Sequence, residues 1–531
     1  MSQQVINMRR WPVHLLYLSF FLYLLIHLLF LEAYPSVNRG GDESWFMDYS
    51  ITFLKTGELK GSIFSLTPLN EPGILNAYVY NGLLSLLFLL TGPGIVWGRL
   101  LSLVAGLLVL YLVYLMGKEL NNPLAGSLGA LLLSVSIYFG IICTELRPEA
   151  LFTLIFCLSM LFFIKFLKRG RPFYLFLSSL FSASLIWIHP NAIVVCLALI
   201  LAYGIFYRKV ISKNTLYLFG GFFVISGIFL ITNYLPLKDR AFSSFSTVHL
   251  NYMPPLLKGD LKAYLITIIR AILFDGYKHF FGGPSRTYMN YVPIFIFFIT
   301  GLIVFMLGLL YGRDRDSKRS IMIPLILCLC LYASSVLLSL QICQQVYLGY
   351  FMPFIALILS MCLLELKRAT EKKRILKGYL IEALVLIILL VSITDYILTG
   401  LRFRSYAREF NSLLQEISSS IPEGSSVLGG SMYYEALLKK DLRLHTYLFM
   451  QNSCPDFRQS LRTLRPEYVI WDNVFDYLAS FWCYEPYRDK IKALLKENSE
   501  VIKDVTIRYP FVFEAREIEM NVVVYKLKPD I

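Results

Sequence analysis

The sequence predicts an all-α bundle of membrane-spanning helices followed by a smaller α/β domain, and three observations support this fold class. The chain has 531 residues, 56% of them hydrophobic, and a mean hydropathy of +0.60. A soluble domain rarely reaches such values because it must cover its core with polar side chains. Apolar stretches of about twenty residues, the length that a helix needs to cross a bilayer, follow one another up to residue 399. Beyond that residue, polar helical segments alternate with strand-like segments.

The apolar stretches predict about eleven membrane spans. The first span follows Arg9 and Arg10, is longer than the apolar part of a signal peptide and is not followed by a small-residue cleavage site, so we expect it to remain uncleaved. In chain order the predicted spans are 12–31, 98–116, 123–140, 149–165, 173–189, 190–207, 215–235, 290–311, 321–340, 346–365 and 376–399.

Basic residues between the spans predict the orientation. The net charge is +14, and Lys and Arg gather in short clusters between apolar stretches. This placement indicates membrane topology rather than nucleic-acid binding. Four connections are strongly basic, around Lys168, Arg208, Arg315 and Arg368. The positive-inside rule places all four in the cytoplasm, together with the N-terminus, and it places the C-terminus on the other side.

The apolar stretch 74–91 is predicted not to cross the membrane. Arg9 and Lys118 are both expected in the cytoplasm, and three crossings between them would place Lys118 outside. The stretch also contains Asn76 and Asn81 and is bounded by a Pro-Gly and a Gly-Pro pair. We therefore expect it to lie along the outer face or to dip into it.

Three regions are expected on the non-cytoplasmic side, and they are 32–97, 236–289 and 400–531. We assign residues 1–400 to a membrane domain and 401–531 to an α/β domain. The α/β domain is predicted to begin with an amphipathic helix, after which strand-like runs follow. The helix is expected near 405–419 and the strands near 426–428, 468–471 and 522–525.

The nine cysteines predict no metal site, because no ligand spacing such as paired CxxC is present. Cys454 and Cys483 lie in the C-terminal domain, where a disulfide and two free thiols are equally open. Most of the others lie within apolar stretches and are expected to be small core residues. These are Cys143, Cys157, Cys196, Cys328, Cys330 and Cys362.

Asp42 and Glu43 are the first candidates for chemistry. They follow a glycine pair just past the first span. The glycines allow a tight turn, and a carboxylate beside a membrane surface can act as the general base for a hydroxyl acceptor. A solvated acidic loop is the alternative interpretation.

Charged residues at the outer ends of later spans form a second group. Arg147 lies between Glu145 and Glu149, and charges near lipid are costly unless they are paired or used. Arg147 could hold a phosphate through two hydrogen bonds, or it could simply pair with one of the two glutamates. His189, at the end of the next predicted span, could donate to a phosphate or could be a structural helix-end histidine.

Two further segments on the same side carry candidate binding residues. The loop 236–289 interleaves aromatic residues with basic ones, among them Lys278 and Arg286. It could be a lid over a substrate or an interfacial loop without chemistry. The segment 344–353 contains Tyr347 and could equally be an aromatic belt with a proline kink. No Walker A loop or GxGxxG motif is present, so cytoplasmic ATP or NAD chemistry has no support.

The order and spacing of these motifs resemble the GT-C superfamily of polyprenyl-phosphate-sugar transferases, over roughly residues 10–400. Within it, the chain looks most similar to the protein O-mannosyltransferases and the lipid A aminoarabinose transferases. The motifs that carry the resemblance are Asp42-Glu43, the stretch from Lys55-Thr56-Gly57 through Pro72-Gly73 to Tyr78, Gly98-Arg99-Leu100, Arg147-Pro148-Glu149-Ala150-Leu151 and His189-Pro190. Two positions depart from the family pattern. Many relatives have Arg directly before the tyrosine at Tyr347, where this chain has Val346. A basic residue often precedes the proline at Pro72, where this chain has Glu71.

The resemblance implies a GT-C fold and an inverting transfer of a sugar from polyprenyl or dolichyl phosphate to a lipid, glycan or protein acceptor. The expected partners are this donor, membrane lipid and the acceptor, without nucleic acid. Asp42 is then the expected catalytic base, assisted or positioned by Glu43. The resemblance implies no certain cofactor, and a divalent metal at this pair is left open. The donor phosphate is expected to contact Arg147, His189, Lys278 and Arg286, and the substrates Glu71 and Tyr347.

Two other function classes remain open. A transporter of lipid-linked saccharides is expected to show internal repeats or charged residues in mid-span. The chain has no clear repeat, and Glu382 and Asp395 lie toward the ends of the last predicted span. A membrane scaffold that uses its C-terminal domain would leave the Asp42-Glu43 motif without a role.

Overall fold

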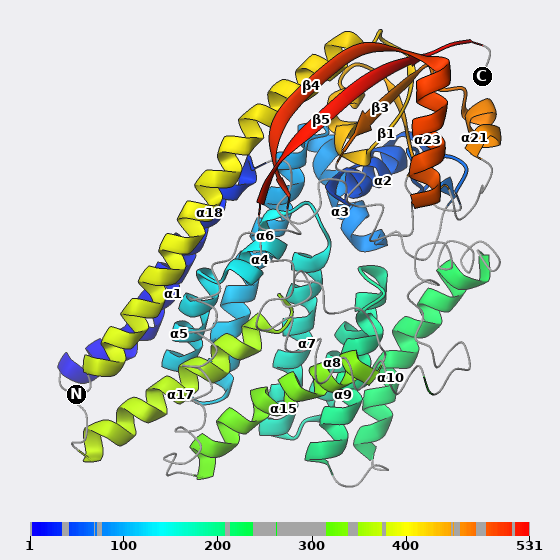
Figure 1. The fold of residues 1–531 in the computed structure, drawn as a ribbon. Coiled ribbons are helices and arrows are strands. Elements are labelled where there is room, and N and C mark those ends of the chain that lie inside the picture. The colour runs from blue at the N-terminus through cyan, green and yellow to red at the C-terminus, as the bar shows by residue number, and fades with distance from the viewer. Residues whose placement is uncertain are drawn as a thin grey trace.

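The structure is a computed structural model with a helical bundle at one end and a sheet domain at the other (Figure 1). The bundle and the C-terminal sheet confirm the predicted fold class. The described residues are 3–33, 42–67, 70–71, 77–207, 213–236, 315–337, 349–373, 379–447, 457–473, 485–511 and 516–529, with the single residues 262 and 450.

The helices of the bundle contain long apolar stretches, as expected for helices that face one another or lipid. Within the described part of the chain, α1, α4, α7, α10 and α18 are long and apolar enough to cross a membrane. The chain is therefore a multi-pass membrane protein. The bundle helices are α1 (Gln3–Leu31), α4 (Ile95–Glu119), α5 (Pro123–Ser134), α6 (Ile137–Thr144), α7 (Glu149–Arg169), α8 (Pro172–Ser184), α9 (Ala192–Phe206), α10 (Lys213–Phe229), α15 (Arg315–Leu337), α17 (Met352–Lys373) and α18 (Tyr379–Ser420).

The span predicted at 123–140 is wrong as a single helix. It consists of α5 and α6, which meet at an angle of 69°. Ser136 lies at the break, where its hydroxyl accepts a hydrogen bond from the backbone N of Phe139 at 3.5 Å and caps α6. The span predicted at 173–189 also ends early, because α8 passes into a 3-10 turn at Leu185–Trp187. The predicted span 290–311 lies outside the described residues, as does the loop 236–289 apart from residues 236 and 262.

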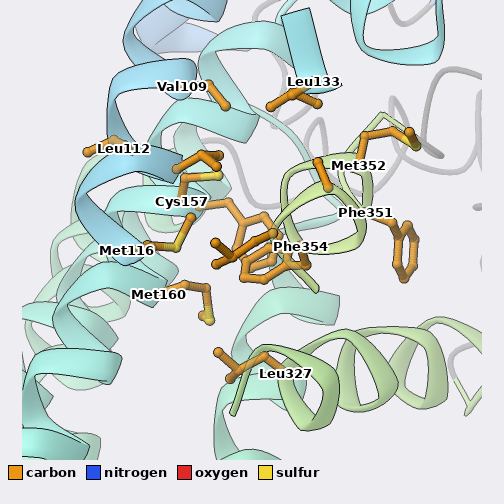
Figure 2. Packing of buried hydrophobic residues seen from close by; sticks show 14 of the residues in the cluster. Val109, Leu112, Met116, Leu133, Cys157, Met160, Leu327, Phe351, Met352 and Phe354 are labelled. Atoms are coloured by element: carbon orange, nitrogen blue, oxygen red, sulfur yellow. The ribbon is translucent and has the colours of Figure 1, made fainter. Parts of the chain in front are cut away.

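The bundle core lies between α4, α5, α7 and α17, and Figure 2 shows part of it. Val109 and Met116 of α4 are buried there with Phe354 of α17. The approach of α4 to α5 depends on glycine, because a Cβ on Gly117 would lie 2.3 Å from the Cα of Gly126. The six cysteines expected as core residues are free and buried or half-buried in helices of the bundle, whereas Cys454 and Cys483 lie outside the described residues.

Two short helices lie at the end of the bundle nearest the sheet (Figure 1). They are α2 (Asp42–Thr56) and α3 (Tyr78–Thr91), and they pack against each other. With 14 residues, α3 is shorter than the roughly 20 residues that a spanning helix needs. Because α8 and α9, which were predicted to span, are similarly short, length does not decide the matter, and it stays a prediction that the stretch 74–91 does not cross.

The bundle and the sheet domain are joined by α18, a single helix of 42 residues and thus about 63 Å long. The sequence predicted a span and a separate amphipathic helix, but the helix runs through residue 400 without a break. Arg404 pairs with Glu32 at the end of α1 at 2.8 Å. Further along α18, Glu409 pairs with Arg508 of the sheet domain at 2.8 Å.

The sheet has five strands in the order β2-β1-β3-β5-β4. They are β1 (Ser426–Gly429), β2 (Arg443–Thr446), β3 (Tyr468–Asp472), β4 (Ser499–Phe511) and β5 (Arg516–Leu527). The first three strands are parallel, and β5 is antiparallel to β3 and to β4. The strands predicted near 426–428, 468–471 and 522–525 are therefore confirmed.

The two faces of the sheet are covered by different parts of the chain. One face carries Val427 and Ile470, which share a core with α2, α3 and the upper part of α18. The other face carries Val469, which packs against α21 (Phe457–Leu464) and α23 (Glu485–Asn498). The short α19 (Tyr434–Leu438) lies beside the first face. The helix α2 is therefore part of the core of the sheet domain as well as of the bundle end.

Candidate functional site

Asp42 and Glu43 form the first turn of α2 and not a loop as the sequence predicted. Carboxylates are favourable in this position because they face the positive end of the helix dipole. Successive residues of a helix point about 100° apart. The side chain of Glu43 is consequently fully buried, whereas that of Asp42 is 25% exposed.

Glu43 forms a two-pronged ion pair with Arg99 of α4. Arg99 Nε donates to Glu43 Oε1 at 2.7 Å, and Arg99 Nη2 donates to Oε2 at 2.6 Å. The backbone N of Leu146 donates to Oε1 at 2.8 Å. Both carboxylate oxygens are thus occupied, and the side chain of Arg99 is only 1% exposed. This placement suits a positioning role better than direct contact with a substrate.

The same Arg99 also holds the end of α1. Its Nη1 donates to the carbonyl oxygens of Leu31 at 3.0 Å and of Ala33 at 2.6 Å. The last carbonyls of a helix have no partner inside the helix, so the guanidinium satisfies them. Gly98 permits this arrangement, because a Cβ there would lie 2.2 Å from the side chain of Leu146. The pair of Arg99 and Glu43 therefore ties together α1, α2, α4 and the segment before α7.

Arg147 lies between two carboxylates. Its Nη1 donates to Asp42 Oδ2 at 2.5 Å, and its Nη2 donates to Glu149 Oε1 at 2.6 Å. Burial alone would lower the pKa of Arg147, but Glu149 and Asp42 together raise it well above its usual value, so the guanidinium stays charged. The sequence left open whether Arg147 pairs with a neighbouring glutamate, and the pair with Glu149 is present.

His189 lies at the edge of the same cluster. It is close enough to Glu149 for an electrostatic interaction between the two side chains. Its Nδ1 accepts a hydrogen bond from the backbone N of Asn191 at 3.1 Å, which leaves Nε2 as the protonated nitrogen of the neutral ring. The edge of the imidazole meets Phe152, with 6.1 Å between the ring centres.

The structure therefore brings together four of the predicted site residues, Asp42, Glu43, Arg147 and His189. Glu71 lies exposed in the loop between α2 and α3. Three other predicted residues, Lys278, Arg286 and Tyr347, lie outside the described residues. Within the part of the chain that the structure describes, no group of three or more His, Cys, Asp and Glu side chains could hold a metal ion.

Sequence reasoning missed two supporting residues of the cluster. Ser102 of α4 donates to the carbonyl oxygen of Arg147 at 3.3 Å. The buried Tyr80 of α3 lies close enough to Glu149 and Glu43 for their charges to act on it, and burial raises its pKa well above the usual value. Arg99 was noticed as a motif residue, but its partner was not identified. An arginine in an otherwise apolar helix is a usable signal, because such a charge needs a buried carboxylate.

Part of the chain that contributes to this cluster is similar to a known protein family. Residues 76–231 match the model of a family described as dolichyl-phosphate-mannose-protein mannosyltransferase. The matching segment contains Arg99, Arg147 and His189. No curated protein matches the chain in sequence.

Several solved structures have a similar fold. ArnT from Cupriavidus metallidurans bound to undecaprenyl phosphate has a TM-score of 0.57 at 11% identity, over 97% of this chain and 98% of that one. The apo oligosaccharyltransferase of Archaeoglobus fulgidus has a TM-score of 0.54 at 12% identity, over 87% of this chain and 70% of that one. AglB of the same organism, in complex with an inhibitory peptide and a dolichol-phosphate, has a TM-score of 0.52 at 12% identity, over 96% and 74%. The likeness confirms the GT-C fold that the sequence predicted.

Proposed function

We propose that this chain is a membrane glycosyltransferase that moves a sugar from a polyprenyl or dolichyl phosphate to an acceptor on the non-cytoplasmic face. The observation that carries the proposal is the partly exposed Asp42 held against the buried Arg147 at the end of the bundle. The family match over residues 76–231 and the GT-C fold support the same class of enzyme.

In the proposed reaction Asp42 is the base. Its carboxylate takes the proton of the acceptor hydroxyl while the acceptor oxygen forms a bond to the anomeric carbon of the sugar. The bond between that carbon and the phosphate oxygen breaks, and its electron pair remains on the leaving lipid phosphate. Attack from the face opposite the phosphate inverts the anomeric carbon. Of the three carboxylates Asp42, Glu43 and Glu149, Asp42 alone is open to an acceptor, with 25% exposure against 0% and 1%.

Arg147 is proposed to bind the donor phosphate, and its present contacts suggest how it would do so. Its Nη1 donates to Asp42, whereas Nε and Nη2 donate to Glu149. A phosphate that takes the Nη1 donor would leave Asp42 Oδ2 free for the acceptor hydroxyl. Donor binding and activation of the base would then be coupled through one guanidinium.

Other residues complete the proposed site. His189 can donate from Nε2 to the phosphate, and Glu43 fixes the first turn of α2 through Arg99. Lys278 and Arg286 are proposed to add positive charge at the phosphate, and Glu71 and Tyr347 to contact the substrates. These four assignments rest on the resemblance alone.

The proposed side of the membrane follows from the direction of the helices. In α4 the site residue Arg99 lies near the first end and Lys118 near the last, and in α7 Glu149 lies at the first end and Arg169 at the last. The basic connections thus lie at the end of the bundle away from the cluster, and the positive-inside rule puts that end in the cytoplasm. A site on the other side cannot reach cytoplasmic nucleotide sugars, which suits a lipid-carried donor.

The test is sugar transfer by the purified full-length protein in lipid nanodiscs. Radiolabelled sugars on synthetic polyprenyl phosphates serve as donors, and the release of lipid phosphate is measured. We expect Asp42→Asn to lose at least about 100-fold in rate. The control is Asp489→Asn, which removes a carboxylate that is 68% exposed on α23, and it should keep the wild-type rate.

The other outcomes are equally informative. Full activity of Asp42→Asn would mean that another group is the base. A wild-type protein that binds the donor but releases no lipid phosphate from any of them would overturn the enzyme and favour a carrier of lipid-linked saccharides or a scaffold.

A further inference from the structure

A second carboxylate of α2, Asp48, is fully buried and is not part of the cluster around Arg147. A buried carboxylate is costly unless several donors satisfy it. Two donors of one loop do so here, and a hydroxyl of the sheet domain adds to them. The hydroxyl of Ser62 and the backbone N of Ile63 donate from the loop after α2, the latter at 3.2 Å. The hydroxyl of Tyr434, in the sheet domain, lies close enough to Asp48 to stabilise its charged form.

The loop that follows α2 is also bound directly to the sheet. The backbone N of Thr446, at the end of the edge strand β2, donates to the carbonyl oxygen of Ile63 at 2.8 Å. His445 bridges the loop and the sheet, with 2.8 Å from Nδ1 to Ser65 Oγ and 3.0 Å from Nε2 to Ser426 Oγ. Apolar residues of α2 and the loop, such as Met47 and Phe64, share a core with the sheet domain.

We propose that Asp48 is a positioning residue that attaches α2 to the C-terminal domain, so that this domain helps to set the place of the base Asp42. The inference rests on the proposed function of Asp42. Asp42 and Asp48 are six residues apart on one helix, which is about 9 Å along its axis. A rigid helix of this length transmits a shift at Asp48 to Asp42.

The chemistry of the site requires a carboxylate and not an amide. An ionised carboxylate only accepts hydrogen bonds, and the groups of Ser62 and Ile63 that face it both donate. The NH2 group of an asparagine would meet one of these donors and leave it without an acceptor. Burial raises the pKa of Asp48 to about 6, an effect that the hydrogen bonds partly offset.

The helix is consequently held at two places by different parts of the molecule. At its first turn, Glu43 is held by Arg99 of the bundle. Five residues later, Asp48 is held by the loop that Thr446 of the sheet binds. Both contacts are needed to fix the position of Asp42. The contact of Glu43 fixes where α2 begins, and the contact of Asp48 fixes the direction in which α2 runs.

The chain offers a matched pair of variants for the test. Tyr434→Phe removes the hydroxyl that interacts with Asp48 and keeps the ring. Tyr433→Phe is the control, because the hydroxyl of the adjacent Tyr433 donates to Asp472 inside the sheet domain at 2.9 Å. Asp48→Asn is the second test variant. All are made in the full-length protein in nanodiscs.

Two measurements are made on each variant. The first is hydrogen–deuterium exchange of the backbone amides of residues 42–67. The second is kcat and KM with a synthetic polyprenyl-phosphate sugar. For Tyr434→Phe and Asp48→Asn we expect exchange in 42–67 to rise about tenfold, since a hydrogen bond to a charged group is lost. We expect kcat to fall about tenfold or more with KM for the donor unchanged, because only the base is displaced. Tyr433→Phe should change neither.

The outcomes separate the inference from the proposed function. Unchanged exchange in both test variants shows that Asp48 does not attach α2, and raised exchange with unchanged kcat shows that the attachment does not position Asp42. Either result overturns the inference. A wild-type protein without transfer activity overturns the proposed function instead, while exchange still decides whether Asp48 holds α2 to the sheet domain.

Discussion

Asp42 and Glu43 are neighbours in the chain but lie in different environments. The first turn of α2 sends Glu43 into the bundle under Arg99 and leaves Asp42 at its edge beside Arg147. One of two adjacent acids is therefore partly exposed, while the other is buried and fixes the helix. The division follows from the helical rotation of about 100° per residue.

Removal of the buried partner of Arg99 should be costly. We predict that Glu43→Gln lowers the free energy of unfolding by about 3–5 kcal/mol, because it leaves a buried guanidinium without its carboxylate. Thermal unfolding in nanodiscs measures the change. The double variant Glu43→Gln with Arg99→Met should lose less than Glu43→Gln alone. A single variant as stable as wild type would contradict the structural role of the pair.

The junction between loop and sheet should respond to acid through His445. Burial, followed by the charge of Arg443, lowers the pKa of His445 to about 4. An imidazole with a lowered pKa contributes stability above its ordinary value of about 6.5, and this contribution is lost as the pH falls from there toward 4. At pH 5 the loss is on the order of 2 kcal/mol.

The measurement compares wild type with His445→Gln at pH 7 and pH 5 by thermal unfolding. Asp48, with its pKa raised to about 6, acts in the opposite direction in this range, because its folded form takes up a proton. Its effect is common to both proteins and cancels in the comparison. We expect the variant to lose less stability than wild type on acidification. An equal loss in both would show that His445 does not govern the response.

The sequence predicted the acidic pair, Arg147 and His189 as site residues because charged and polar groups at helix ends near lipid stand out against an apolar background. It could not predict which groups pair. Glu43 and Arg99 are 56 residues apart, and their contact depends on how α1, α2 and α4 cross. Asp48 was missed because its partners come from a loop and from a domain almost 400 residues away in the chain.

At the scale of elements, a predicted span agrees with the structure where a long apolar stretch forms one helix. It is wrong where a local break divides the stretch into two helices. The break between α5 and α6 falls at Ser134-Val135-Ser136, which contains neither Gly nor Pro. The sequence did not predict that α18 is continuous, because its side chains change from apolar to amphipathic near residue 400. A helix can continue from lipid into water through such a change. The edge strand β2 is short and polar, whereas β4 does alternate around Val505 and Ile507 and could have been predicted.

The contact between α6 and α18 gives a prediction at this scale. A Cβ on Gly140 of α6 would lie 1.5 Å from the hydroxyl oxygen of Tyr396 on α18. We predict that Gly140→Ala lowers the free energy of unfolding by about 1–3 kcal/mol through overpacking. Gly227→Ala on α10 is the control, because no atom lies within 4 Å of its Cβ position. The control should be neutral or slightly stabilising, since alanine favours helix.

A second substitution tests the cause of that effect in thermal unfolding. Tyr396→Phe removes the hydroxyl that meets the new methyl group, so it should restore part of the stability of Gly140→Ala. Equal losses with and without the hydroxyl would mean that the ring carbons of Tyr396, 2.4 and 2.6 Å from the new methyl group, and not its hydroxyl, cause the loss.

At the scale of the whole molecule, the cluster around Arg147 lies between the helical bundle and the sheet domain. The bundle supplies Arg99, Arg147 and His189, and the sheet domain holds α2 from the other side. Figure 1 shows α18 running along α1 from the bundle to the sheet. The order of the units was predictable from hydropathy, but the shared core around α2 was not, because it forms only when both units are folded.

The orientation of the whole molecule in the membrane gives the last prediction. Glu423 lies exposed in the turn after α18, at the sheet-domain end, and Arg171 lies exposed between α7 and α8, at the basic end. A maleimide that cannot cross membranes should label Glu423→Cys in intact cells and Arg171→Cys only after the membrane is opened. Labelling of the native cysteines is subtracted with the wild-type protein. The reverse pattern would place Asp42 and Arg147 in the cytoplasm, where nucleotide sugars are accessible, and the argument for a lipid-carried donor from topology would then be lost.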